Sequence, residues 1–359
     1  MKAFIYNSQP GRVVFGSGAL ESLEQEVELL GAERVVVLST PGQQGPAQAI
    51  AQRLDRRAAG IFPRAVMHVP MALVSEARAE ARRLGADCLV AMGGGSTVGL
   101  AKAIALELDL PILAIPTTYA GSEMTPIYGM TEGGVKKTGK DPRVLPRTVI
   151  YDPDLTLRLP VALSITSGMN AIAHAAEGLY AKDGNPIMAM MAEEGIRALA
   201  GAMPVLRRQP TDADARADAL YGAWLCGTVL GNVGMALHHK LCHTLGGTFN
   251  LPHAEVHTVI LPQAIAFNAP FARPAMARIE RALGTQGASS AAAALFDLAR
   301  DNGAPVALKV LGGIAEADLA HAADLAVQAP YWNPRQIDAG QRDAIHQLLL
   351  AAYHGIRPD

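Results

Sequence analysis

The chain contains 359 residues, of which 50% are hydrophobic, and its formal net charge at pH 7 is −2. This length allows two domains with a large core, and the composition excludes a disordered or fibrous protein. Acidic and basic residues are mixed along the chain, so we expect no nucleic-acid partner. The three cysteines lack CxxC spacing, which favours a reducing cytoplasm over a disulfide framework. No segment has the pattern of a transmembrane helix or a signal peptide, so we expect a cytoplasmic protein with no membrane partner.

Short β-branched runs alternate with segments of helical periodicity as far as Asp152. Strands are predicted at Val35–Leu38, Ala65–His68, Cys88–Met92, Ile112–Ile115 and Val149–Asp152, and helices at Ala47–Leu54, Val74–Leu84 and Thr97–Leu108. Strand–helix–strand alternation implies parallel pairing, which is typical of a Rossmann-like three-layer α/β fold.

The pattern changes after this segment. From residue 161 onward, apolar residues recur at helical spacing, and Ala and Leu dominate. The sequence therefore predicts an α/β dinucleotide-binding domain over 1–160 and an all-helical catalytic domain over 161–359. We expect the active site to lie in the cleft between them, a common location in cofactor enzymes.

Two polar loops of the first domain have the composition of a phosphate-binding site. The GGGS loop at 93–96 connects a predicted strand to a predicted helix, and its glycines would let free backbone amides approach a pyrophosphate. The loop at 116–123 follows the next strand and offers hydroxyl groups and amides to the same edge of the sheet. The predicted cofactor-binding residues are Gly93, Gly94, Gly95, Ser96, Thr117, Thr118 and Ser122, together with Thr40 and Lys137. The motif differs from GxGxxG, and the alternative is a turn whose glycines serve backbone geometry alone.

The loop after Val35–Leu38 bears on the choice between NADH and NADPH. An acidic residue there would accept a hydrogen bond from the 2′-hydroxyl of NAD, whereas an arginine would attract the 2′-phosphate of NADP. Ser39 and Thr40 in this loop do neither. We therefore expect the protein to accept both cofactors.

Four histidines and an asparagine form the candidate catalytic cluster. His239 and His243 are four residues apart, so both project from one helix face, and His253 follows after a Gly-Gly pair and a proline. His174 lies upstream, four residues after Asn170. This cluster suits a divalent metal, except that Asn170 stands where a carboxylate ligand is expected. For any single histidine, the alternative is a buried side chain with satisfied hydrogen bonds.

These motifs resemble the iron-containing (group III) alcohol dehydrogenase family over essentially the full chain. The matching features are GGGS at 93–96 with Lys102, PTT at 116–118, GSE at 121–123, the pair at 170 and 174, and HxxxHxxxxxxxxxH from 239 to 253. The resemblance implies a dehydroquinate synthase-like architecture, a nicotinamide cofactor and a homodimer. It also implies that residues equivalent to positions 170, 174, 239 and 253 bind a metal, and that His243 lies beside the nicotinamide.

Two residues depart from the family pattern, and longer stretches resemble one branch of the family. Asn170 replaces the metal-binding Asp, and Gly99 replaces the Asp of GGGSxxDxAK. The stretches at 116–129, 136–146, 167–181 and 238–257 look like the maleylacetate reductase branch. This resemblance implies reduction of the carbon–carbon double bond of 2-maleylacetate to 3-oxoadipate, in the bacterial degradation of aromatic compounds.

The implied reaction tolerates the loss of a metal. Hydride addition to a conjugated ketone spreads the developing charge into an enolate, which hydrogen-bond donors can stabilise in place of a Lewis acid. We therefore expect a metal-independent site, although three imidazoles alone can bind zinc. In this hypothesis His243 and His253 donate to the enolate oxygen or supply the proton. The other predicted catalytic residues, which line the pocket, are His174, His239, Asn170 and Tyr119.

A small dicarboxylate substrate also needs cationic or donor groups. The candidates are Lys240, His238, Lys136 and Lys137, and the alternative for the lysines is a solvated side chain, as it is for Lys102 on its helix. Three other functions remain open: a metal-dependent alcohol dehydrogenase acting on small alcohols or aldehydes, a cyclase or polyol-phosphate enzyme related to dehydroquinate synthase, and a dinucleotide-binding module without turnover.

Overall fold

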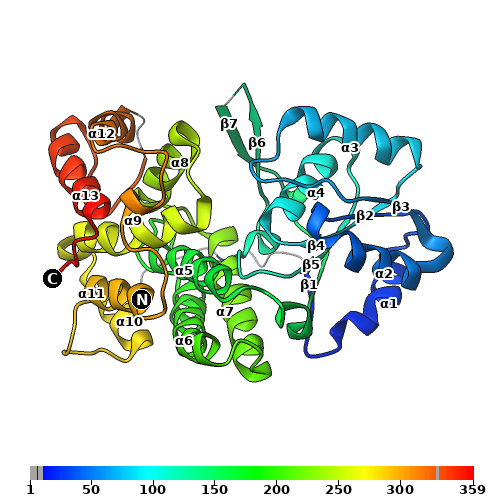
Figure 1. Ribbon diagram of the computed structural model, residues 1–359, viewed down its shortest axis with the longest axis horizontal. Helices are drawn as coiled ribbons and strands as arrows, with labels where there is room; N and C mark the ends of the chain where they lie inside the picture. The colour runs from blue at the N-terminus through cyan, green and yellow to red at the C-terminus, as the bar shows by residue number, and fades with distance from the viewer. Residues whose placement is uncertain (1–5, 7–10, 134, 329–330) are drawn as a thin grey trace. The chain divides into compact units, whose positions relative to one another are not determined.

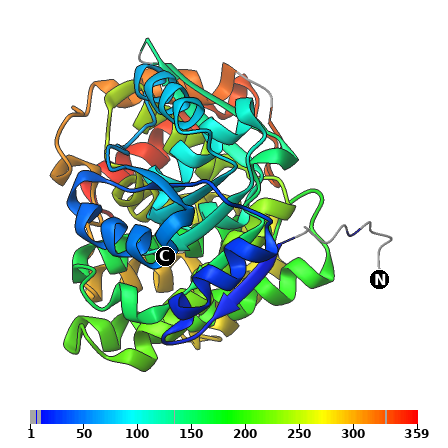
Figure 2. The same ribbon diagram turned by 90° about the vertical axis from the view of Figure 1, so that its right-hand side faces the viewer.

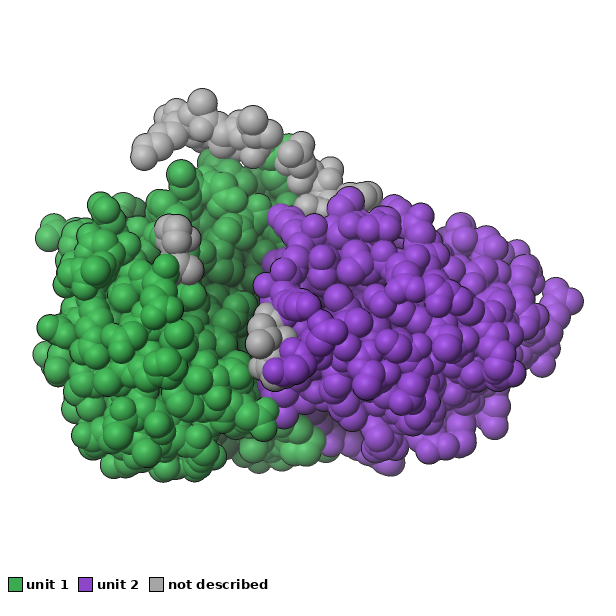
Figure 3. All heavy atoms as spheres, turned by 90° about the horizontal axis from the view of Figure 1, so that it is seen from above, with its two compact units in different colours: residues 1–7, 160–359 green, residues 8–159 purple. Residues whose placement is uncertain are grey.

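The computed structural model describes residues 6, 11–133, 135–328 and 331–359. The chain divides between Leu159 and Pro160 into two compact units, which Figure 3 colours separately. The α/β unit (Ser8–Leu159) contains an open parallel sheet with helices, and the helical unit (Pro160–Asp359) is built from helices. This confirms the predicted combination of a Rossmann-like α/β part and an all-α part.

The sheet of the α/β unit has six parallel strands in the order β1-β8-β5-β4-β2-β3. The strands are β1 (Arg12–Phe15), β2 (Val35–Leu38), β3 (Ala58–Phe62), β4 (Cys88–Gly93), β5 (Ile112–Pro116) and β8 (Thr148–Tyr151). The helices of this unit are α1 (Leu23–Leu29), α2 (Gln44–Leu54), α3 (Met71–Arg83) and α4 (Gly95–Leu108). Figures 1 and 2 show these helices around the sheet.

Helices cover both faces of this sheet. On one face, alternate residues of the strands, such as Val35 and Val37 of β2, form a core with Val27 of α1 and Ile50 of α2. On the other face, α4 packs against β4, β5 and β2, and α3 packs on α4. Because both faces are covered, every residue of β2, β4 and β5 is buried.

The chain order reverses between β2 and β4. β3 extends the sheet on one side of β2, whereas β4, β5 and β8 extend it on the other. Open α/β sheets bind ligands at the carboxyl ends of the strands beside such a reversal. Thr40 follows β2, and the loop at 93–96 starts at Gly93, the last residue of β4, so these predicted cofactor residues lie at the carboxyl ends of the strands beside the reversal.

Several strands differ from the prediction. Ala65–His68 is not a strand, because His68 and the following Val69 have φ angles of 66° and 47°, in the left-handed region that strands do not use. The third strand is β3, whose Ala-Ala-Gly start lacks β-branched residues. β1 and an antiparallel hairpin formed by β6 (Ile127–Glu132) and β7 (Val135–Lys140) also lie outside the predicted strands.

The helical unit is arranged around one buried helix. Its helices are α5 (Val161–Gly178), α6 (Pro186–Arg208), α7 (Ala213–Asn232), α8 (Leu237–Phe249), α9 (His253–Asn268), α10 (Arg273–Leu283), α11 (Ala291–Asp301), α12 (Asp318–Gln328) and α13 (Arg342–His354). α5 is buried without interruption from Ser164 to Gly178 and packs against α6, α7 and α9. A second apolar core joins α8, α9, α12 and α13. α5 and α8 therefore have rigid surroundings, which suits helices that carry a site.

Two further expectations concern the cysteines and membrane contact. Cys88, Cys226 and Cys242 are free and buried, as their spacing predicts. No single helix of the described ranges is long and apolar enough to span a membrane; the pair α7 and α8, bent by 95°, passes that test by length and composition alone.

Candidate active site

The two predicted phosphate loops of the α/β unit lie against each other. The Thr117 amide donates to the Gly93 carbonyl at 3.2 Å, and Gln43 Nε2 donates to Thr117 Oγ1 at 2.8 Å. A Cβ atom at Gly94 would lie 2.9 Å from the Thr118 side chain, and Gly93 has a φ of 149°. Glycine is therefore required at both positions for the loops to approach this closely.

The helix after the glycine loop has no side-chain cap. α4 begins at Gly95, and its N-cap residue, Gly94, provides no side-chain hydrogen bond. The first amides of a helix have no partner within the helix, and together with the helix dipole they favour an anion such as phosphate. This geometry supports the predicted roles of Gly94, Gly95 and Ser96.

Lys102 is fully buried, and it is not the solvated helix residue that the sequence left open. Its Nζ donates to the Ser122 carbonyl at 2.6 Å and to the Thr125 hydroxyl and the Ile127 carbonyl at 2.9 Å and 2.8 Å. These three acceptors match the three N–H bonds of an ammonium group. Burial lowers the Lys102 pKa from 10.5 to about 7, and the Glu123 carboxylate opposes this shift. Lys102 therefore holds the second phosphate loop in shape.

The other residues predicted for this loop region have varied surroundings. Thr40 is partly exposed after β2, and its carbonyl accepts from the Gln43 amide at 3.0 Å. Tyr119 is fully buried within the second loop. Lys137 lies exposed on β7 and pairs with the Glu132 carboxylate at 2.6 Å, so its contact with the cofactor stays a prediction.

Three helices of the helical unit bring the predicted histidines together. α5 carries Asn170 and His174, α8 carries His239 and His243, and α9 begins at His253. The ring centroids of His174 and His239 are 5.0 Å apart, and those of His239 and His243 are 6.2 Å apart. Residues separated by four positions share a helix face, which is why the sequence spacing predicts this cluster.

A continuous chain of hydrogen bonds forms the buried side of the cluster. Asn170 Nδ2 lies 3.3 Å from His174 Nε2, and His174 Nδ1 lies 2.8 Å from His239 Nε2. His239 Nδ1 in turn lies 2.7 Å from the Glu177 carboxylate. Burial lowers the His239 pKa well below its usual value, and the nearby His243 adds to this shift. The His239 imidazole is therefore neutral at physiological pH.

Glu177 is a site residue outside the predicted set. Its fully buried carboxylate accepts from the backbone amides of Ala236 and His238, both at 2.9 Å, as well as from His239 Nδ1. It thereby caps α8, whose own N-cap residue, Ala236, makes no side-chain hydrogen bond. A signal was present in the sequence, because Glu177 lies three residues after His174 on α5, on the same face.

Two other buried histidines adjoin the cluster. His238 Nε2 donates to the His257 carbonyl at 3.0 Å, and burial lowers the His238 pKa to about 4. Of the two roles predicted for His238 toward a dicarboxylate, cation or hydrogen-bond donor, burial disfavours the cationic one, and the donor role stays a prediction. His257 is also fully buried, and neither of its ring nitrogens has a hydrogen-bond partner in the described part of the chain. Its ring packs against that of His253, with centroids 4.2 Å apart and the ring planes tilted by 53°.

The open side of the cluster carries His243 and His253. His243 is exposed and His253 is partly exposed, whereas His174, His239 and Asn170 are each at most 6% exposed. Only accessible imidazoles can exchange protons directly with a ligand. His243 and His253, to which the prediction assigns proton delivery, are thus the accessible pair, and the roles themselves stay predictions.

The donor set does not fit the metal that the family resemblance implies. Asn170 supplies an amide where the family has a carboxylate, and its Oδ1 atom is buried without a hydrogen-bond partner among the described residues. His174 Nδ1 and His239 Nε2 are 2.8 Å apart and hydrogen-bonded to each other. A second group, His238, His239 and His257, has ligand atoms within 4.8 Å of one another. In this group, His238 Nε2 already donates to the His257 carbonyl, and His239 Nδ1 lies 2.7 Å from the Glu177 carboxylate.

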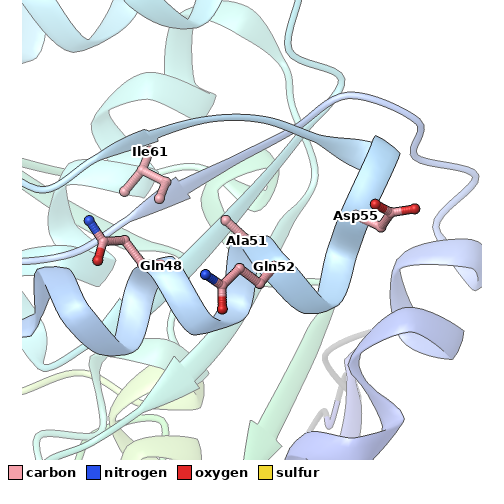
Figure 4. Close-up of a pocket in the computed structure, with 5 residues that line it drawn as sticks. All are labelled: Gln48, Ala51, Gln52, Asp55 and Ile61. Carbon is pink, nitrogen blue, oxygen red and sulfur yellow. The ribbon is translucent and has the colours of Figure 1, made fainter.

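A surface pocket lies elsewhere, in the α/β unit. Figure 4 shows its lining residues on α2, on β3 and at the turn between them. These residues are Gln48, Ala51, Gln52, Asp55 and Ile61. They bring no histidine and none of the predicted site residues, so we assign no catalytic role to this pocket.

Comparisons with known proteins cover both units. The family model described as "Iron-containing alcohol dehydrogenase" matches residues 10–153, and that described as "Fe-containing alcohol dehydrogenase family, C-terminal" matches residues 164–353. Maleylacetate reductase from Burkholderia cepacia is 62% identical to this chain over 358 residues, which cover 100% of each protein.

Solved structures give the same picture. The crystal structure of maleylacetate reductase from Agrobacterium tumefaciens is similar with a TM-score of 0.94 and 53% identity, and covers 100% of each chain. That of maleylacetate reductase from Rhizobium sp. strain MTP-10005 has a TM-score of 0.94 and 52% identity, again over 100% of each chain. The similarity therefore includes fold and sequence over the whole length.

Proposed function

Because this chain belongs to the iron-containing alcohol dehydrogenase family, we propose that it reduces the carbon–carbon double bond of 2-maleylacetate to give 3-oxoadipate, with NADH or NADPH as hydride donor. The full-length similarity to maleylacetate reductases supports the substrate. The observation within the site that carries the proposal is Asn170, which closes a hydrogen-bond chain where other family members hold a metal. The enzyme is thus an oxidoreductase suited to a conjugated substrate.

The proposed reaction balances as a hydride and a proton transfer. The reduced nicotinamide gives a hydride to the alkene carbon β to the ketone, and the electron pair of the double bond moves to form an enolate. A proton then adds to the carbon next to the ketone, which restores the carbonyl group. A delocalised enolate needs less stabilisation than an alkoxide, so neutral hydrogen-bond donors suffice.

The histidines divide these tasks. His243 and His253, on the open side of the cluster, donate to the enolate oxygen and deliver the proton. The Asn170 Oδ1 atom is buried without a partner in the described residues, and an unpaired buried acceptor costs about 1–3 kcal/mol. A hydrogen-bond donor of the ligand would relieve this cost. In the α/β unit, the loops at 93–96 and 116–123 bind the pyrophosphate of the cofactor.

Cofactor choice follows from the loop after β2. Ser39 is fully buried and Thr40 is partly exposed, and neither carries a charge that would select for or against the 2′-phosphate. We therefore propose that NADH and NADPH support turnover with kcat/KM values within about a hundredfold of each other. The proposal further includes function without a metal, a homodimer and a cytoplasmic location.

The test is NADH oxidation by the purified protein with 2-maleylacetate, with and without EDTA, beside a panel of simple aldehydes. Turnover of 2-maleylacetate that EDTA leaves unchanged is the expected result. Loss of activity with EDTA and its recovery with Fe²⁺ or Zn²⁺ would overturn metal independence but keep the reductase. Activity on aldehydes alone would overturn the substrate and identify a metal-dependent or metal-free alcohol dehydrogenase.

A further inference from the structure

We infer that Asn170 and Glu177 fix the direction of the hydrogen-bond chain through His174 and His239, and that this direction closes the site to a divalent cation. The inference concerns the tautomers of two histidines and goes beyond the proposed reaction. Its test measures proton positions and cation binding instead of turnover, so it can fail while the proposed function stands.

The direction is set first at Glu177. An ionised carboxylate only accepts hydrogen bonds. The amides of Ala236 and His238 donate to it at 2.9 Å and hold it in place at the start of α8. The third donor, at 2.7 Å, is His239 Nδ1. His239 therefore carries its proton on Nδ1 and keeps a lone pair on Nε2.

The same logic continues through the next ring. The lone pair on His239 Nε2 needs a donor, and His174 Nδ1 lies 2.8 Å from it. His174 consequently carries its proton on Nδ1 and a lone pair on Nε2. The last donor is the Asn170 amide, whose Nδ2 lies 3.3 Å from His174 Nε2. Each of the three links between Asn170 and Glu177 then joins one donor to one acceptor, with one proton on each ring.

A carboxylate at position 170 would break this pattern. Aspartate only accepts, so His174 would turn its proton toward position 170 while His239 still donates to Glu177. Two lone pairs, on His174 Nδ1 and His239 Nε2, would then face each other at the present distance of 2.8 Å. Only an added proton or a metal cation between them removes this repulsion. The amide of Asn170 therefore decides whether the chain requires a cation.

The first experiment reads the tautomers directly. The full-length protein is labelled with ¹⁵N-histidine, and His174 and His239 are assigned from the resonances that disappear in His174→Asn and His239→Asn. We expect both rings to be neutral and protonated on Nδ1. A proton on Nε2 of either ring, or a charged imidazolium, would overturn the inference.

The second experiment uses Co²⁺ as the probe, because its visible spectrum reports coordination. We expect Asn170→Asp to bind one Co²⁺ per chain, and the unaltered protein and the matched control Asn170→Ala to bind at least about tenfold more weakly, which is about 1.4 kcal/mol. Equal Co²⁺ binding by all three proteins would contradict the role of Asn170. The tautomer measurement needs no variant at position 170, so it decides the question even where Asn170→Asp fails to fold.

Glu177→Gln tests the other end of the chain. Glutamine can donate as well as accept, so we expect the His239 ring to lose its single tautomer while the chain remains folded by circular dichroism. A His239 tautomer unchanged in folded Glu177→Gln would show that Glu177 only caps α8 and does not position the histidine.

Discussion

The Nζ atom of Lys102 lies 2.6 Å from the Ser122 carbonyl oxygen, so a fully buried cation fixes the loop that we propose binds the cofactor. Thr125 and Ile127 supply the other two acceptors, at 2.9 Å and 2.8 Å. A buried lysine is costly unless its donors are satisfied. Here they are satisfied by Ser122 of the second phosphate loop and by the residues just after it, which links the stability of the fold to the shape of the site.

Replacing this cation should weaken cofactor binding more than it slows chemistry. Each hydrogen bond to a charged group is worth about 1.5–3 kcal/mol, so we expect Lys102→Met to raise the KM for NADH at least about tenfold. We expect kcat to change less, since the contacts of Lys102 are with the second phosphate loop and the residues just after it, and the histidines proposed to act on the substrate belong to the helical unit. Steady-state kinetics measure this KM, and the control is Lys309→Met, an exposed lysine whose loss should leave the KM for NADH unchanged. The same KM for NADH in both variants would contradict the role of Lys102 in holding the cofactor loop.

The low pKa of Lys102 predicts that stability increases with pH. In the folded protein the Lys102 pKa is about 7 against an ordinary value of 10.5, so above neutral pH the unfolded chain binds more protons than the folded one. The free energy of unfolding should therefore rise between pH 7 and about pH 8.5. Cys88, whose pKa burial raises from 9.0 to about 12, acts in the opposite direction at higher pH.

Urea denaturation across this pH range measures the effect. The rise attributable to Lys102 is the difference between the unaltered protein and Lys102→Met, in which no ammonium is present at position 102. Parallel pH dependences in the two proteins would mean that Lys102 does not titrate in this range.

The glycine loop predicts a local steric effect. A Cβ atom at Gly94 would lie 2.9 Å from Thr118, so Gly94→Ala should push the two phosphate loops apart and reduce NADH affinity by about tenfold or more. Gly201, on α6, has open space at its Cβ position, and Gly201→Ala is the matched control. Isothermal titration with NADH should separate the two variants; equal affinities would remove the steric argument.

The exposed histidines should control turnover. Loss of a general acid or of a donor to the enolate typically costs about 10²–10⁴-fold in rate, so we expect kcat for 2-maleylacetate to fall by that range in His243→Ala and in His253→Ala. NADH binding should be retained. His321, exposed on α12, gives the control His321→Ala. Full activity in both site variants would move the proton donor to another residue.

Much of the site follows from local spacing. The GGGS loop between a buried strand and a helix, and histidines four positions apart, are patterns that short-range geometry makes readable. Glu177 has the same kind of signal, because it lies seven residues after Asn170 on the same face of α5. A single acidic residue in an apolar helix can nevertheless hydrogen-bond to water, pair with a lysine or cap another helix, and the spacing of residues in the sequence does not distinguish these three partners.

The sequence by itself determined the α/β and all-helical parts, the two phosphate loops and the histidines that cluster. Only the tertiary structure decided that Lys102 is buried beneath a loop, that His238 is neutral, and that Glu177 meets a histidine 62 positions away. The spacing of apolar residues predicts which face of a helix is buried, because that spacing follows from the number of residues per turn within a single helix. The partner across the interface, and with it the pKa and the tautomer, depends on how distant helices pack.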